Sequence, residues 1–187
     1  CGRRTVETCS ISIRLDSDDP AAIVATALFG DGAAAAVIST QGTALAHVEG
    51  SGERLWPGTL EIMGWRVEDP GLAVVFDRAI PPFLENNLRE GLDAILDGLG
   101  LSFADIDRLC SHPGGAKVLT AMESALGLQT GTLDLERTVL REHGNMSAPT
   151  VLFVLQRLLE RGLPSRTLMT ALGPGFTLAA LSLRRPF

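Results

Sequence analysis

The sequence feature that most constrains the fold is a strand-turn-helix unit around His112. An apolar run, Ile106–Cys110, has the character of an inward-facing strand, and Pro113-Gly114-Gly115 then turn the chain into a helix-like segment, Ala116–Leu126. Such a unit places His112 at the carboxyl end of a strand, where open α/β sheets hold their functional groups. The sequence therefore predicts an α/β fold with His112 at one edge of a sheet.

Asn145 occupies a similar position further along the chain. It follows the short helix-like segment Glu136–Glu142 and a glycine, and it precedes the apolar helix Ala148–Leu159, which is expected to be central and buried. Two neutral hydrogen-bond donors on tight turns suit the binding of an anionic oxygen. Taken alone, a histidine after a strand also fits a capping or core role, and an asparagine before a helix also fits an N-cap.

The remaining segments alternate between apolar strands and helices. We expect helices at Ala21–Phe29 and from Pro81 to Leu99, a loop at Glu53–Gly58, and strands at Thr5–Ile13, Ala33–Ser39, Ala44–Ser51, Leu60–Val67, Leu72–Asp77, Thr167–Leu172 and Thr177–Leu183. The last two strands are expected to pair across the Gly173–Phe176 loop. His47 alternates with apolar positions and is interpreted as structural. This alternation predicts a layered α/β fold.

Composition excludes several classes of function. A chain of 187 residues with 45% hydrophobic residues is long enough for one domain with a sizeable core. The net charge is −6 and no basic run is present, so nucleic acid is not an expected partner. No run reaches the ~18 apolar residues of a membrane span. Three cysteines are too few for a disulfide framework, and the three histidines are not spaced as metal ligands. We therefore expect a cytoplasmic protein with reduced thiols.

Four short phrases occur in a specific order and carry a family resemblance. They are LFGDGAA at Leu28–Ala34, HPGG at His112–Gly115, GNMS at Gly144–Ser147 and GPGFT at Gly173–Thr177. Together they resemble the C-terminal half of type III polyketide synthases, the chalcone-synthase-like branch of the thiolase superfamily. The resemblance covers nearly the whole chain. It implies that residues 1–187 form one thiolase-like domain, the later half of an αβαβα architecture, with the N-terminal half outside this sequence.

The resemblance also implies a mechanism and its residues. Members of the family use a Cys-His-Asn triad, in which His112 and Asn145 match the histidine and the asparagine. The nucleophilic cysteine of the family precedes this region, so it is not assigned to Cys1, Cys9 or Cys110. An imidazolium would stabilise that thiolate. The implied reaction is a decarboxylative Claisen condensation of malonyl-CoA onto an acyl-CoA starter, with no cofactor and no metal.

Further positions are implied to contact substrate. Phe29 matches a phenylalanine that gates the passage between the CoA tunnel and the cavity, and Val74 aligns near a second gate phenylalanine. Because valine is smaller, a wider passage and a bulkier starter are expected. Gly64 aligns with a family glycine at a position where a larger side chain reduces the cavity volume. The other positions are Gly114, Gly115 and Lys117 near the CoA arm, Ser147 in the GNMS phrase, and Gly173, Pro174 and Gly175 in a loop that shapes the cavity.

Three other interpretations are compatible with parts of the pattern. A ketoacyl-ACP synthase III-like enzyme would condense once, an acidic scaffold domain would use GDG and GPG only as turns, and an actin-like fold would bind nucleotide. Family members are homodimers, so a second copy and the N-terminal half of the same enzyme are the expected partners. An isolated chain of residues 1–187 is expected to expose apolar surface and to be inactive.

Overall fold

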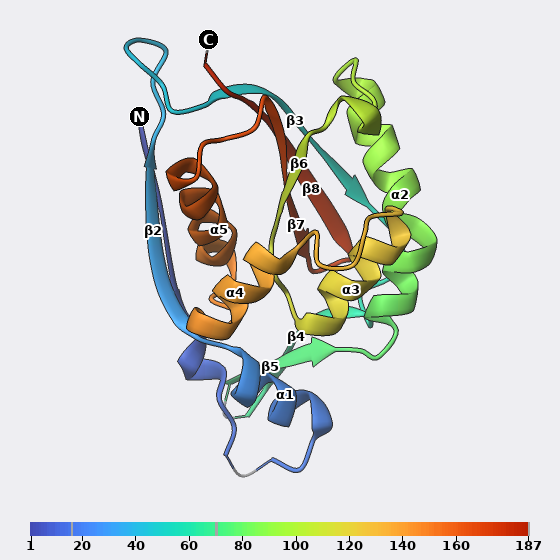
Figure 1. Ribbon diagram of the computed structural model, residues 1–187. Coiled ribbons are helices and arrows are strands. Elements are labelled where there is room, and N and C mark those ends of the chain that lie inside the picture. Colours follow the sequence, from blue (N-terminus) through green and yellow to red (C-terminus); the bar gives the residue numbers. More distant parts are fainter. Residues whose placement is uncertain (16, 70, 187) are drawn as a thin grey trace.

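A computed structural model describes residues 1–15, 17–69 and 71–186 (Figure 1). The strands are β1 (Gly2–Thr8), β2 (Asp31–Val37), β3 (His47–Leu55), β4 (Met63–Glu68), β5 (Gly71–Phe76), β6 (Arg108–Ser111), β7 (Arg166–Gly173) and β8 (Thr177–Arg184). The helices are α1 (Pro20–Leu28), α2 (Ile80–Gly98), α3 (Ala116–Ala125), α4 (Asp134–His143) and α5 (Ala148–Glu160), with short 3-10 turns at Cys9–Ser12 and Phe103–Asp105.

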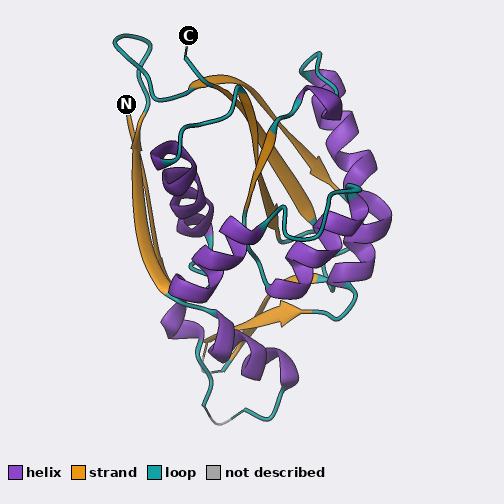
Figure 2. Ribbon diagram, viewed as in Figure 1, coloured by secondary structure: helices purple, strands orange, loops and turns teal. Residues whose placement is uncertain are grey.

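A four-stranded sheet forms the centre of the molecule. Its order is β3-β8-β7-β6, with β6 parallel to β7 and the other pairs antiparallel. Figure 2 shows this sheet between two groups of helices. Because successive side chains of a strand face opposite sides, Leu109 and Leu168 pack with α2 and α3, while Cys110 and Met169 pack with α4 and α5. The sheet therefore has a hydrophobic core on each face.

Several expectations from the sequence are confirmed. His112 directly follows the last residue of β6, and its backbone N–H donates to Thr170 O on β7 (2.8 Å). β7 and β8 pair across the predicted loop, with Gly173 opposite Thr177. The long helix α2 buries one face and leaves the other exposed, as its spacing predicts. The prediction that α5 is a central, buried helix is wrong in part, because the helix buries only some of its residues, including Val154 and Leu158.

The first predicted strand, Thr5–Ile13, is wrong in its second half. β1 ends at Thr8, which pairs with Asp31, and residues Cys9–Ser12 form a 3-10 turn. The backbone N–H and the hydroxyl of Ser10 both donate to the Asp31 carboxylate (2.7 Å each), which draws the chain out of the ladder. The same contact explains why β2 begins at Asp31 rather than at the predicted Ala33.

The third strand also differs from the prediction. β3 covers His47–Leu55 instead of Ala44–Ser51, so part of the predicted loop Glu53–Gly58 is strand. Polar residues are tolerated there because β3 is an edge strand: Glu53 pairs with Ala179, and Glu49 binds Arg166 (2.8 Å). His47 is exposed at the start of this strand and does not line the cavity described below.

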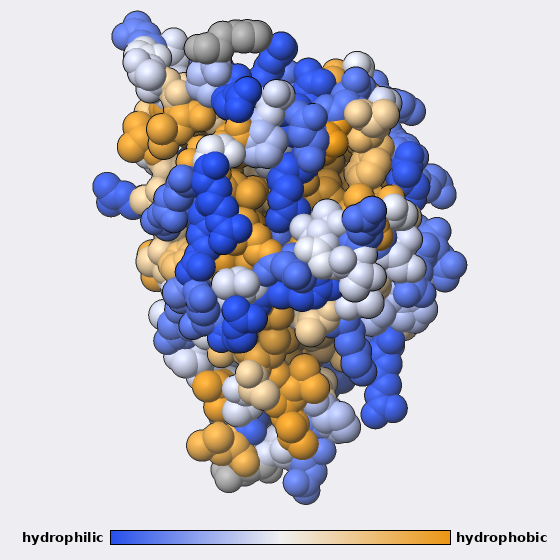
Figure 3. Space-filling model, viewed as in Figure 1, coloured by the Kyte–Doolittle hydropathy of each residue, from blue (hydrophilic) through white to orange (hydrophobic). Residues whose placement is uncertain are grey.

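Exposed apolar side chains are concentrated on the β1–β2 strand pair, the β4–β5 hairpin and the adjoining segments. Val37 and Val67 are each 88% exposed, and Leu15 is 84% exposed. Figure 3 shows apolar patches at the lower end of the molecule, where α1 and the β4–β5 hairpin lie in Figure 1. The expected exposure of apolar surface is therefore confirmed. Among the described residues, no helix has both the length and the apolar character needed to cross a membrane.

Candidate active site

A cavity of about 570 Å³ lies between the β4–β5 hairpin, the Cys9–Ser12 turn and the two turns that carry His112 and Asn145. The predicted residues that line it are Phe29, Gly64, Val74, His112, Gly114, Asn145, Ser147 and Pro174. The fold therefore gathers residues from five separate segments of the chain around one space. Such a cavity is large enough for part of a small-molecule substrate.

Four predicted residues lie outside the cavity wall. Gly115 precedes the first residue of α3, and Lys117 is exposed in the first turn of that helix. Gly173 ends β7, and Gly175 lies in the turn before β8. Their suggested contacts with substrate are untested and stay predictions.

Asn145 is held by four hydrogen bonds. Its backbone N–H donates to Leu28 O (2.7 Å), and its carbonyl accepts from Gly30 N (3.0 Å). Its side-chain Oδ1 accepts from Ser147 N (2.9 Å), and Nδ2 donates to Gly114 O (3.2 Å). Since an amide nitrogen carries two hydrogens, one donor of Asn145 has no partner in the described part of the chain. The side chain is 4% exposed and lines the cavity.

Gly114 connects the backbone of His112 to the side-chain amide of Asn145. The N–H of Gly114 donates to the His112 carbonyl (3.0 Å), while the Gly114 carbonyl accepts from Asn145. The ring is half-buried in the cavity wall. Burial lowers its pKa to about 4, so the imidazole is neutral at pH 7 in this chain. The imidazolium expected from the sequence would need a negative partner, and a thiolate is one.

Two glycines allow the close backbone approach at this site. A Cβ at Gly30 would collide with the carbonyl oxygen of His143, which is backbone and cannot move aside. Gly144 has φ +72°, and a Cβ there would lie 2.8 Å from Leu28 O. Both positions therefore require glycine. This requirement gives a structural reason for the glycines of the LFGDG and GNMS phrases.

Two aromatic residues of the wall, Trp65 and Phe76, were not predicted from the sequence. Trp65 pairs with Val74 across the β4–β5 hairpin, and Phe76 makes an edge contact with Phe29 at 6.0 Å between ring centroids. The available signal was strand alternation, because Phe76 lies two residues beyond Val74 and therefore on the same face. The space next to Val74 is thus bordered by two other large rings.

The three cysteines occupy different environments. Cys110 is fully buried and its Sγ contacts Val151 O at 3.7 Å, so it is a core thiol, as predicted. Burial raises the pKa of the Cys110 thiol. Cys9 lines the cavity, and burial also raises its pKa, with Glu7 and Asp31 adding to the effect. Cys1 is exposed. Among the described residues, no three metal-binding side chains cluster together.

Comparison with protein families decides what kind of chain this is. Residues 47–185 match the family model described as chalcone and stilbene synthases, C-terminal domain. The chain belongs to the chalcone and stilbene synthase family. It is 35% identical to a putative chalcone synthase of Bacillus subtilis, over 92% of this chain and 50% of that protein. It is 37% identical to a 1,3,6,8-tetrahydroxynaphthalene synthase of Streptomyces peucetius, over 96% of this chain and 50% of that protein.

Solved structures show the same fold. The bacterial type III polyketide synthase 1,3,6,8-tetrahydroxynaphthalene synthase of Streptomyces coelicolor superposes with a TM-score of 0.91 and 26% identity, over 100% of this chain and 54% of that chain. The type III polyketide synthase domain of Steely1 from Dictyostelium gives a TM-score of 0.89 and 27% identity, over 98% and 53%. The chain therefore has the thiolase-like fold of the C-terminal half of these chalcone-synthase relatives. It spans about half of the relatives' length.

Proposed function

We propose that this region supplies His112 and Asn145 to the active site of a type III polyketide synthase that condenses malonyl-CoA with an acyl-CoA starter. The observation that carries the proposal is the shared cavity wall. His112 and Asn145 both line it, they are joined through Gly114, and Asn145 keeps a second amide hydrogen available. Two donors directed at one space suit an oxygen that develops negative charge.

The reaction explains why neutral donors are useful there. When malonyl-CoA loses carbon dioxide, the electrons of the broken C–C bond move into an enolate on the thioester oxygen. Donors from His112 and Asn145 stabilise that oxygen, and the loss of one such donor typically costs about 100- to 1000-fold in rate. The enolate carbon then attacks the acyl thioester on a cysteine, and the C–S bond to that cysteine breaks. The product is a β-ketoacyl-CoA and a free thiolate.

The cysteine is proposed to come from the N-terminal half of the same enzyme. In the described chain, Cys110 is inaccessible in the core, and Cys9 carries a raised pKa, the opposite of an activated thiol. A thiolate placed beside His112 would raise the pKa of the ring, because an opposite charge favours the protonated form. The exposed apolar side chains of the β1–β2 pair and the β4–β5 hairpin support a partner half and a homodimer. We also propose that the enzyme is cytoplasmic and needs no cofactor.

Starter selection is proposed to depend on the wall around Val74. Phe29 and Val74 would form the passage to the CoA tunnel, and Gly64 and Ser147 would border the cavity. Gly114, Gly115 and Lys117 would lie along the CoA arm. The loop Gly173-Pro174-Gly175 would shape the far side. Because the Phe29 ring contacts Phe76, the extra width at Val74 lies beside that aromatic pair.

The test is product formation by the complete enzyme with malonyl-CoA and an acyl-CoA series. His112→Gln and Asn145→Asp should each reduce condensation by at least about 100-fold. The matched controls His47→Gln and Asn86→Asp, both exposed and outside the cavity, should leave it unchanged. A single condensation would indicate a ketoacyl synthase III-like enzyme instead. If the wild-type enzyme forms no condensation product and the variants change only the stability of the protein, the domain is a scaffold.

A further inference from the structure

Helix α4 leads into Asn145, and two adjacent charged residues fix it to the segments on either side of His112. Glu136 bonds to β6, whose last residue precedes His112. Arg137 bonds to α3, which begins where the His112 turn ends. Neither side chain lines the cavity, so the chemistry described above uses neither.

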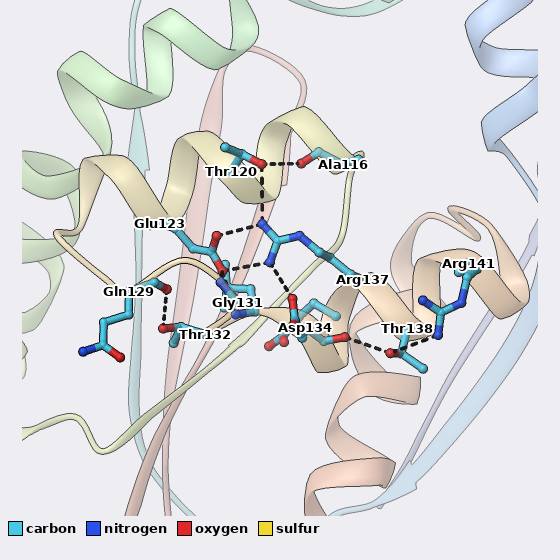
Figure 4. Close-up of polar contacts among 12 residues, drawn as sticks. Ala116, Thr120, Glu123, Gln129, Gly131, Thr132, Asp134, Arg137, Thr138 and Arg141 are labelled. Carbon is cyan, nitrogen blue, oxygen red and sulfur yellow. Dashed lines mark hydrogen bonds and ion pairs between the residues drawn. The ribbon is translucent and has the colours of Figure 1, made fainter.

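Arg137 holds α3 through two points of contact with one buried carboxylate (Figure 4). Its Nη1 donates to Glu123 Oε1 (2.8 Å) and its Nη2 to Glu123 Oε2 (2.7 Å). Glu123 is 3% exposed and also accepts from the backbone N–H groups of Gly131 (3.1 Å) and Leu133 (2.8 Å). The bonds from Arg137 lower the pKa of Glu123, so this carboxylate is ionised. A bidentate pair of this kind fixes orientation as well as distance.

Glu136 holds the strand immediately before His112. It is fully buried, and Arg108 Nη2 donates to its Oε2 (2.7 Å). The backbone N–H of Ser111, the residue before His112, donates to its Oε1 (3.3 Å). The hydroxyl of Ser111 in turn accepts from Thr170 Oγ1 (2.9 Å). α4 is therefore attached to the chain both before and after the His112 turn.

These attachments matter because few direct bonds join Asn145 to the His112 turn. The side chain of Asn145 reaches the His112 turn through one hydrogen bond, from Nδ2 to Gly114 O at 3.2 Å. The other bonds of Asn145 go to Leu28, Gly30 and Ser147, outside the His112 turn, so its place relative to that turn depends also on how α4 is held. A displacement of about 1 Å of a catalytic group can cost on the order of 100-fold in rate.

We propose that Arg137 is a positioning residue: its two-point hold on Glu123 fixes α4 against α3, so that Asn145 and His112 direct their donors at the same oxygen. This inference rests on the proposed function. The replacement Arg137→Met keeps the length of the side chain and removes both bonds to Glu123, together with the longer bonds to Asp134 (3.2 Å) and Thr120 (3.4 Å). Arg137→Lys keeps the charge but offers a single ammonium in place of the planar fork.

The matched control is Arg166→Met. Arg166 also binds one glutamate through two nitrogens, at 2.8 and 3.1 Å to Glu49, and its side chain is 21% exposed against 25% for Arg137. It joins β7 to β3 and does not contact α4. The two substitutions therefore each remove a two-point bond to one glutamate, at different places in the fold.

The experiment measures two quantities on the complete enzyme. One is kcat and KM for condensation, and the other is hydrogen exchange at the amides of Gly114 and Asn145. Arg137→Met should lower kcat by at least about 10-fold with KM within about 2-fold, and should speed exchange at both amides by at least about 10-fold. Arg137→Lys should fall between Arg137→Met and the wild type. Arg166→Met should change neither quantity at matched stability.

Two results would overturn the inference. One is equal kcat for Arg137→Met and Arg166→Met in an active enzyme. The other is unchanged exchange at Gly114 and Asn145 in both Arg137 variants. If the proposed function is wrong, the wild-type enzyme forms no condensation product. The hydrogen-exchange measurement would still test whether Arg137 fixes α4 against α3.

Discussion

Phe29 and Asn145 lie side by side in a parallel β-bridge, although they are far apart in the sequence. The bonds that make the bridge run from Asn145 N to Leu28 O and from Gly30 N to Asn145 O. The bridge joins the residue proposed to gate the cavity to the residue proposed to stabilise the enolate. Both positions therefore depend on how closely the two backbones approach.

Replacing Gly30 with alanine should break this relationship. The new Cβ would meet the His143 carbonyl, so the backbones must separate, and overpacking of this kind costs about 1–3 kcal/mol of unfolding free energy. Urea unfolding measures the loss directly. Gly71→Ala is the control, because a Cβ there has nothing within 4 Å. Equal midpoints for the two variants would show that the approach at Gly30 is not tight.

The fold could be predicted from the sequence where local pattern and long-range packing agree. The unit around His112 is such a case, because an apolar strand, a Pro-Gly-Gly turn and a helix are each signalled locally. The end of β1 is not, since it depends on Ser10 binding Asp31. Strand propensity carries no information on that contact.

The candidate site was predicted from its four sequence motifs, whereas the geometry of its wall was predicted only in part. His112 and Asn145 were identified, but Trp65 and Phe76 were missed, because a residue becomes part of a cavity wall through hairpin register. The ion pairs of Glu136 and Arg137 could not be predicted from the sequence either, since they depend on how α4 packs against β6 and α3.

Stability of the 187-residue chain should depend on pH through His112. Burial lowers the folded pKa from 6.5 to about 4, so the unfolded chain binds a proton first as the pH falls. The stabilising contribution is complete above pH 6.5 and is lost between pH 6.5 and 4. It amounts to at most about 3 kcal/mol, because the ring is partly exposed. As the pH falls from 6.5 to 4, the unfolding free energy of the wild type should fall relative to that of His112→Gln by up to about 3 kcal/mol; parallel curves would contradict the assignment.

Thiol reactivity should separate the cysteines. Cys110 is fully buried with a raised pKa and should resist iodoacetamide at pH 8 in the folded chain, whereas exposed Cys1 should react. Peptide mass spectrometry after alkylation gives the rates. Labelling of Cys110 as fast as Cys1 would show that the core around α5 opens.

Filling the space at Val74 should change which starters the complete enzyme accepts. Val74 is 8% exposed and lines the cavity, so Val74→Phe would place a ring beside Phe29 and Phe76. We expect kcat/KM for long or bulky acyl-CoA starters to fall by about 10-fold or more relative to short ones. Leu45→Phe, at an exposed position outside the cavity, is the control. An unchanged starter preference would remove Val74 from the passage.

The most direct measurement is the rate at which the complete enzyme releases carbon dioxide from malonyl-CoA, for the wild type and for Asn145→Leu. Leucine matches the size of asparagine but has no amide, so the donor to the enolate oxygen, the bond to Gly114 O and the acceptor for Ser147 N are all lost. We expect carbon dioxide release at least about 100-fold slower with little change in KM. Release at the wild-type rate would contradict the claim that Asn145 stabilises the enolate.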